Sequence, residues 1–145
     1  MQSIEADTIV LGTLRVRFLV EPEQSGGSVS VFECVVPAGA KVPAPHSHDG
    51  FEETVYGLAG TSSWTIDGGA VKLGPGEAVC IPRGAVHGFD NRAGEEARFL
   101  AIASPGVFGP SYFREMAGVL AAAAGGPPDR SALADVMQRH GLTPA

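Results

Sequence analysis

Short stretches of alternating apolar and polar residues, separated by glycine and proline, fill the chain from residue 9 to residue 103. Residues 15–20 show the pattern well, since Val16, Phe18 and Val20 alternate with arginines and a leucine. Successive side chains of a strand point to opposite faces, so this alternation predicts strands. The other predicted strands span residues 29–34, 63–67, 70–73, 78–81, 86–90 and 98–103. Many short strands with such turns predict an all-β sandwich or barrel.

The pattern changes after Pro105-Gly106, where the β alternation stops. Residues 111–124 and 129–140 are predicted to form two helices, with Gly125-Gly-Pro-Pro between them and Gly141 at the second stop. Each helix carries an apolar stripe, made of Tyr112, Phe113, Met116 and Leu120 in the first and Leu133, Val136 and Met137 in the second. The stripes predict one buried face per helix. Two placements of the helices stay open. They either cover the outside of the barrel or a dimer interface, or they form a lid across the barrel mouth.

The chain therefore divides into a barrel of residues 1–109 and a helical C-terminal extension of residues 110–145 packed on it. His140 falls in the last turn of the second helix, where a cationic side chain favours the helix dipole, so we interpret it as a helix cap. A length of 145 residues with 44% hydrophobic content suits one domain with a single core. No internal repeat is visible, which excludes a duplicated two-barrel protein.

Charge and the chain start narrow the possible partners and location. Ten Lys plus Arg against sixteen Asp plus Glu give a net charge of -6, which argues against nucleic acid and anionic membranes as partners. The start, Met-Gln-Ser-Ile-Glu-Ala-Asp, has neither a basic region nor an apolar run, and no stretch approaches transmembrane length. We therefore expect a cytoplasmic protein. Cys34 and Cys80 lie in apolar strand-like surroundings, so both are expected to be reduced, buried thiols.

Three of the four histidines fall within two glycine-bounded segments. The segment from Gly39 to Gly60 contains His46, His48 and Glu53. The segment from Gly76 to Asn91 contains Pro82, Gly84 and His87. These four side chains are plausible metal ligands.

The two segments resemble the paired signature motifs of the cupin superfamily, in which the first motif supplies His, His and Glu and the second a further His. The second motif has the family's spacing, whereas Gly39 lies one residue farther from His46 than in the usual first motif. The resemblance implies a double-stranded β-helix, a jelly-roll barrel with a ligand-sized interior. The C-terminal tail is similar to that of bacterial single-barrel cupins grouped with quercetin dioxygenase-like proteins.

Strand geometry predicts how the four ligands meet. His46 and His48 are two residues apart, so both imidazoles face one side of an extended strand. Glu53 would then face the other side unless the chain turns, and Asp49-Gly50 is a suitable turn dipeptide. A second turn at residues 82–84 can deliver His87 from a different strand.

Three imidazoles and one carboxylate form a sulfur-free site for one divalent transition metal: Fe, Ni, Cu, Co, Mn or Zn. A metal that prefers six ligands keeps two positions open beside these four, which substrate or dioxygen needs.

Several neighbouring residues have two possible roles. Glu52 is either a solvated or salt-bridged surface residue or a residue that supports the metal ligands. Arg83 either steers an anionic substrate or is an ordinary turn residue. Gly84 and Asn91 are interpreted as turn-makers. Val55 and Phe89 are expected on the inward face. Residues that either line the barrel or form its packed core are Phe32, Cys34, Trp64, Ile66, Phe99 and Ala101.

The resemblance to quercetinase-like cupins implies a metal-dependent oxygenase that acts on an aromatic or enol-type small molecule. In that reaction Glu53 is the catalytic residue, either as a lasting ligand or by leaving the metal to take a proton. The alternatives are Lewis-acid isomerase, decarboxylase or lyase chemistry without oxygen, and a non-catalytic module that binds a metal or small molecule. Cupin relatives commonly pair through sheet edges, so a homodimer through the strand of residues 15–20 is also expected.

Overall fold

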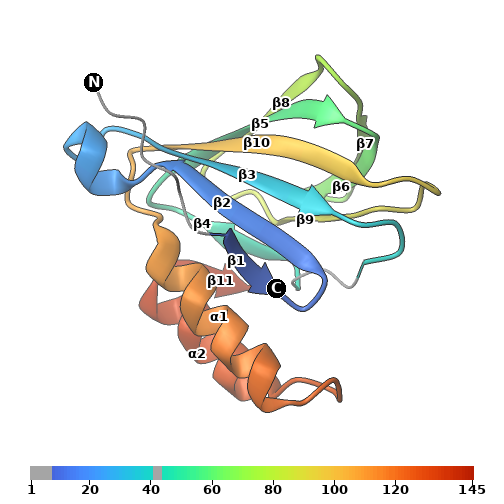
Figure 1. Cartoon of the computed structure of the whole chain (residues 1–145). Coiled ribbons are helices and arrows are strands. Elements are labelled where there is room, and N and C mark those ends of the chain that lie inside the picture. The colour runs from blue at the N-terminus through green and yellow to red at the C-terminus, as the bar shows by residue number, and fades with distance from the viewer. Residues whose placement is uncertain (1–7, 41–43) are drawn as a thin grey trace.

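Two antiparallel sheets face each other and form a jelly-roll barrel, with two helices at the C-terminal end of the chain (Figure 1). This computed structural model describes residues 8–40 and 44–145. The chain start, for which we expected no leader, and residues 41–43, between Gly39 and His46, lie outside the described residues. The expected all-β class and barrel are confirmed.

The strands follow a fixed order in each sheet. The six-stranded sheet has the order β1 (Thr8–Leu11), β2 (Leu14–Val20), β3 (Ser30–Val36), β10 (Ala97–Ser104), β5 (Glu52–Ala59) and β8 (Ala78–Ile81). The five-stranded sheet has the order β11 (Leu142–Pro144), β4 (His46–His48), β9 (His87–Asp90), β6 (Ser62–Ile66) and β7 (Gly69–Leu73). A 3-10 helix (η1, Pro22–Ser25) connects β2 to β3.

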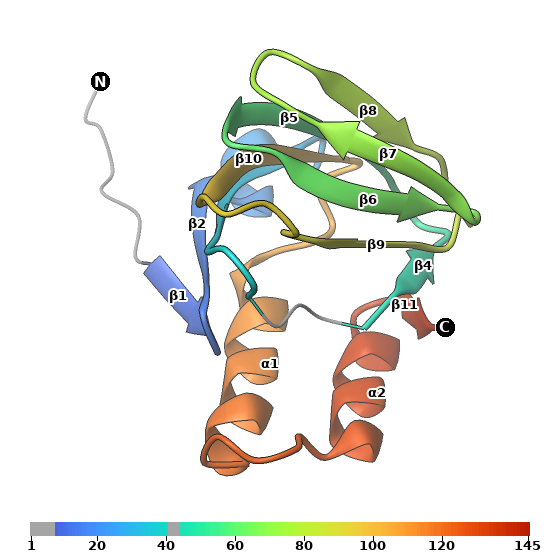
Figure 2. The same ribbon diagram turned by 90° about the vertical axis from the view of Figure 1, so that its right-hand side faces the viewer.

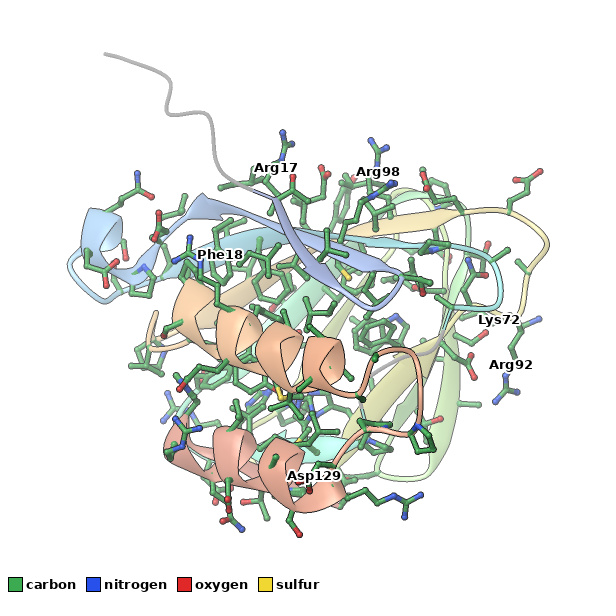
Figure 3. The ribbon with its side chains drawn as sticks, turned by 60° about the horizontal axis from the view of Figure 1, so that its bottom comes forward. Arg17, Phe18, Lys72, Arg92, Arg98 and Asp129 are labelled. Atoms are coloured by element: carbon green, nitrogen blue, oxygen red, sulfur yellow. The ribbon has the colours of Figure 1, made fainter. Side chains whose placement is uncertain are left out.

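The alternation in β2 sorts its side chains between the core and solvent. Leu14, Val16 and Phe18 are buried, while the arginines between them are exposed. In Figure 3 the labelled Arg17 and Arg98 point away from the barrel, whereas Phe18 lies on the inner side of the sheet. Phe18 stands opposite Phe32 of β3, with the ring centroids 5.1 Å apart. Such cross-strand aromatic pairs fix the register of two strands.

The hairpin between β6 and β7 has a two-residue turn. Asp67 and Gly68 are the turn residues, with φ of +47° and +81°, and Gly69 already pairs with Ile66. Two consecutive positive φ values define the turn type that matches strand twist, and aspartate before glycine is a preferred pair for it.

Helices α1 (Pro110–Ala122) and α2 (Arg130–Arg139) lie side by side beneath the barrel (Figure 2). Pro110 stands in the first turn of α1, and the Asp129 carboxylate accepts a hydrogen bond from the Ala132 backbone N–H at 3.1 Å at the start of α2. Both helices were expected at these places. Neither has the length and apolar composition of a segment that crosses a bilayer.

Helix α1 packs onto aromatic side chains of the six-stranded sheet. The Phe113 ring lies 5.1 Å from Phe32 and 5.7 Å from Phe18, and Met116 is buried on the same helix face. The apolar stripe of α1 therefore buries one helix face against this sheet, as the helical spacing predicted.

The chain after α2 returns to the barrel as β11, an element that the sequence pattern did not reveal. Residues Leu142, Thr143 and Pro144 pair with His48, Ser47 and His46 of β4. On its other side β4 meets β9 through the pair His46 and His87. The strand that carries two histidines thus depends on the end of the chain for most of its backbone pairing.

The expected burial of both cysteines is correct for one of them. Cys34 is buried in β3, but Cys80 is exposed, and both thiols are free. Strand β8 lies at the edge of its sheet, where Ile81 points inward and Cys80 outward. The apolar composition around Cys80 therefore misled the prediction, because an edge strand leaves one face in solvent.

Candidate metal centre

The five-stranded sheet carries a cluster of three histidines at the inner side of the barrel, and the six-stranded sheet places Glu53 beside it. His46 and His48 come from β4, and His87 is the first residue of the neighbouring β9. Glu53 comes from β5 in the other sheet, and the chain turns between His48 and β5 as expected. The Gly84 backbone N–H donates to the His48 carbonyl at 3.0 Å, which ties the two predicted turns together. The structure therefore brings all four sequence-predicted site residues into one region.

The three histidines are placed so that they could hold one metal ion. One potential ligand atom from each lies within 4.8 Å of the others, and His48 and His87 are buried. Each Nδ1 is within hydrogen-bonding reach of a backbone carbonyl: His46 to Ala44 at 3.3 Å, His48 to Phe51 at 2.8 Å and His87 to Ala85 at 2.9 Å. An Nδ1–H that donates leaves the Nε2 lone pair free, which is the usual arrangement of metal-binding histidines.

The His48 Nε2 atom fits this interpretation because it is buried and has no hydrogen-bond partner among the described residues. Glu53 Oε1 lies 3.3 Å away. Two ligands that each bind one transition metal at roughly 2.1 Å and at right angles stand about 3 Å apart. The donors present thus suit a nitrogen and oxygen site for such a metal.

Charge in this region also favours a bound cation. Burial, and next the neighbouring His87, lower the pKa of His46 to about 4, and burial lowers the pKa of His87. Burial by itself would raise the pKa of Glu53, but the contact with His48 and the nearby imidazoles outweigh it and hold this pKa below its usual value. At neutral pH His46 and His87 are neutral and the buried Glu53 carboxylate carries a negative charge, which a metal ion would balance.

Residues 32–103 match the protein family described as the cupin domain. The chain carries a cupin domain. The matched residues include the four site residues, so the sequence resemblance is confirmed. The match ends before α1, which means that the two helices lie outside the matched cupin domain.

Known relatives of the cupin domain have different activities. The chain is 26% identical over 116 residues to quercetin 2,3-dioxygenase of Bacillus subtilis, which covers 80% of this chain and 34% of that protein. The chain therefore spans about a third of the length of this relative. It resembles the structure of the polyketide cyclase RemF from Streptomyces resistomycificus with a TM-score of 0.61 and 26% identity, over 79% of this chain and 89% of that chain.

A further structural relative is a predicted oxalate decarboxylase from Thermotoga maritima, with a TM-score of 0.64 and 20% identity over 72% of this chain and 96% of that chain. This likeness shows the fold alone. The match over residues 32–103 shows the cupin family, and the different activities of the relatives mean that the family does not by itself specify a reaction.

The cupin barrel encloses a mostly apolar cavity of about 60 Å³ next to His46, Glu53 and His87. Among the sequence-predicted candidates, the residues that line it are Phe32, Cys34, Trp64, Phe89 and Phe99. The other three, Val55, Ile66 and Ala101, pack in the core instead. Sequence reasoning missed Phe108, Tyr112 and Phe113, which also line the cavity. Helical spacing showed that α1 buries a face, but it could not show that this face meets the cavity.

The polar neighbours of the cupin motifs have structural roles. The Arg83 Nε donates to Glu52 Oε2 at 2.7 Å, and about half of each side chain is exposed, so Glu52 forms a surface salt bridge and Arg83 does not line the cavity. The buried Asn91 amide donates to the Val36 carbonyl at 3.0 Å and holds the loop after β9. Gly84 has a φ of +82°, as its turn requires. Both turn assignments are therefore confirmed.

His140 ends α2, as the cap interpretation expected. Its Nε2 contacts a Glu115 carboxylate oxygen on α1, and its ring packs against Tyr112 with the centroids 5.5 Å apart. His140 therefore links the two helices behind the cavity wall and takes no part in the metal centre.

Proposed function

We propose that this cupin is a metal-dependent oxygenase acting on a small aromatic or enol-type molecule. In this proposal His46, His48, His87 and Glu53 hold one divalent transition metal. The observation that carries the proposal is the free, buried Nε2 of His48 beside a negatively charged Glu53, at the wall of an apolar cavity. An apolar lining favours a lipophilic ligand over a sugar phosphate.

The metal would serve as a Lewis acid that lowers the pKa of a substrate hydroxyl and brings dioxygen to the same place. The protein residues supply the rest. The three backbone carbonyls keep the imidazoles in the tautomer that presents Nε2. Glu53, charged at neutral pH, accepts the proton of the substrate hydroxyl at a carboxylate oxygen, and the aromatic walls exclude water.

The likeness to quercetin 2,3-dioxygenase supports the oxygenase reading, since it covers 80% of this chain. The likeness to the cyclase RemF supports a second candidate, Lewis-acid chemistry without oxygen, because it covers 89% of that smaller relative. Both reactions use the same metal and the same cavity. Oxygen consumption therefore separates them.

The experiment begins with elemental analysis of the purified protein, followed by oxygen-electrode measurements over catechols, diketones and flavonols. Under the proposal, uptake requires one metal, and Glu53→Gln abolishes turnover while much of the metal remains bound. Glu52→Gln is the matched control, since it changes the neighbouring carboxylate on the opposite face of β5. Turnover without oxygen establishes the second candidate, and tight ligand binding without turnover indicates a non-catalytic module. Unchanged uptake in Glu53→Gln contradicts the role of this residue.

Three expectations remain part of the proposal: the division into a barrel of residues 1–109 and a helical extension of residues 110–145, the homodimer, and the cytoplasmic location. The strand of residues 15–20 is not the sheet edge that the dimer prediction assumed, because β2 pairs with both β1 and β3. Gel filtration with light scattering tests the dimer.

A further inference from the structure

Tyr112 is a polar residue that helix α1 places in the cavity wall, outside the region matched by the cupin domain. Its side chain is 3% exposed, and it lines the same cavity as His46, Glu53 and His87. Apart from the histidines and Glu53, most of the residues that line this cavity are aliphatic or aromatic. A hydroxyl in such a wall is the kind of isolated polar group that orients a ligand in an apolar pocket.

The Tyr112 hydroxyl is available as a hydrogen-bond donor. Its pKa is raised by burial and next by the negative charge of Glu53, with no hydrogen bond to a described residue among the causes. The phenol therefore stays protonated at neutral pH and lies within electrostatic range of the metal-site carboxylate. A hydrogen bond from this hydroxyl to a ligand oxygen in the cavity would contribute about 0.5–1.5 kcal/mol to binding.

The Tyr112 ring is held in place from several sides. Phe108 and Phe113 lie 4.7 Å and 5.1 Å from it, and His140 packs edge-on against it at 5.5 Å. His140 is itself held by its contact with Glu115. A fixed ring gives the hydroxyl a fixed position, so little conformational entropy is lost when a ligand accepts its hydrogen bond.

The size of the cavity limits what such a ligand can be. A volume of about 60 Å³ corresponds to roughly two water molecules, so a single six-membered ring is the largest ligand that the cavity could admit, and its aromatic walls would have to move outward to do so. The rings of Trp64, Phe89 and Phe99 pack together with centroids 4.9 to 5.3 Å apart and form part of its wall. A three-ring flavonol would have to displace either this aromatic group or α1.

We propose that Tyr112 is a substrate-binding residue whose hydroxyl donates a hydrogen bond to an oxygen of a single-ring aromatic or enol-type ligand. The ligand's other oxygen faces the histidines. This inference rests on the proposed function for the metal end of the ligand, but the Tyr112 contact is tested separately, by binding.

The test uses zinc-loaded protein, because zinc has no redox chemistry and turnover is not needed. 4-Nitrocatechol is titrated against the protein, and binding is followed by its visible absorbance and by quenching of Trp64, the single tryptophan of the chain. Tyr112→Phe keeps the ring and its packing and removes the hydroxyl. Tyr56→Phe is the matched control, since Tyr56 is the other tyrosine and is 40% exposed on β5. The same titrations are repeated in EDTA.

Tyr112→Phe is expected to raise the Kd for 4-nitrocatechol about five- to tenfold, the size of one net hydrogen bond, while Tyr56→Phe leaves it unchanged. Quercetin is expected to bind wild-type protein at least about tenfold more weakly than 4-nitrocatechol. Any of four results overturns the inference. Two concern the variants: an unchanged Kd in Tyr112→Phe, or an equal rise of the Kd in Tyr112→Phe and Tyr56→Phe. Two concern the wild-type protein: tighter binding of quercetin than of 4-nitrocatechol, or no binding of 4-nitrocatechol. An absence of oxygen uptake together with the expected Kd values contradicts only the proposed oxygenase.

Discussion

His46 and His87 stand opposite each other across β4 and β9, with their ring centroids 4.7 Å apart. This residue pair joins the two strands, so the proposed metal ligands are also the contact between them. Through Glu53 the same cluster reaches β5 of the other sheet. A metal bound here would connect three strands of the barrel.

Metal removal is therefore expected to lower thermal stability. Metal at about a thousandfold above its Kd stabilises the folded state by about 4 kcal/mol, which for a chain of this size shifts Tm by on the order of 10 °C. Thermal melts in EDTA and with added zinc, nickel or iron measure the shift. His87→Ala should abolish the metal-dependent shift of Tm, whereas His140→Ala should retain it. A shift of equal size in both variants would mean that the metal binds elsewhere.

Acid should destabilise the metal-free protein through His46. Its pKa is about 4 in the folded chain, because of burial and the adjacent His87, against 6.5 as the ordinary value. Between these values the unfolded chain binds more protons, so stability rises with pH across this window and falls as pH decreases. We expect a loss of about 1–3 kcal/mol from pH 7 to pH 4.5. Urea midpoints in EDTA measure it, and His46→Asn should give a flatter profile. An identical profile for that variant would contradict the prediction.

The two cysteines should react very differently with thiol reagents. Burial raises the pKa of Cys34 to about 12, so at pH 8 its thiolate is scarce as well as inaccessible, whereas Cys80 is exposed. Titration of native protein with a chromogenic disulfide should count one thiol, and denatured protein should show two. Cys80→Ser should remove the native signal. Two reactive thiols in the native protein would be incompatible with the packing around Cys34.

Replacement of Leu142 should damage both the fold and the metal centre. Leu142 is 2% exposed and pairs with His48 through β11, so Leu142→Ala is expected to cost about 2–4 kcal/mol and to weaken metal binding. Thr143→Ala on the exposed face of the same strand should change stability by less than about 0.5 kcal/mol. Chemical denaturation and metal titration measure the two effects. Unaltered metal affinity in Leu142→Ala would show that β4 does not need β11.

The sequence predicted the parts of the fold that a local pattern specifies. Alternation identified β2, the glycine-bounded motifs identified the four site residues, and helical spacing identified α1 and α2. Tyr112 shows the limit of a local pattern. Its helical spacing predicted burial, but the cavity that it lines is formed together with residues of distant strands, which the spacing does not reveal. Strand β11 was missed because three residues that end in proline show no alternation, and their pairing partner lies in the middle of the chain. Cys80 was misplaced because sheet edges are set by topology.

The pairing of β11 with β4 also sets an order of events during synthesis. The strand with His46 and His48 leaves the ribosome well before β9 and long before β11. Until residues 142–144 emerge, β4 has an unpaired edge on a nascent chain whose other strands can already associate. The edge of β4 that carries His46 and His48 is therefore paired only after residues 142–144 have been translated.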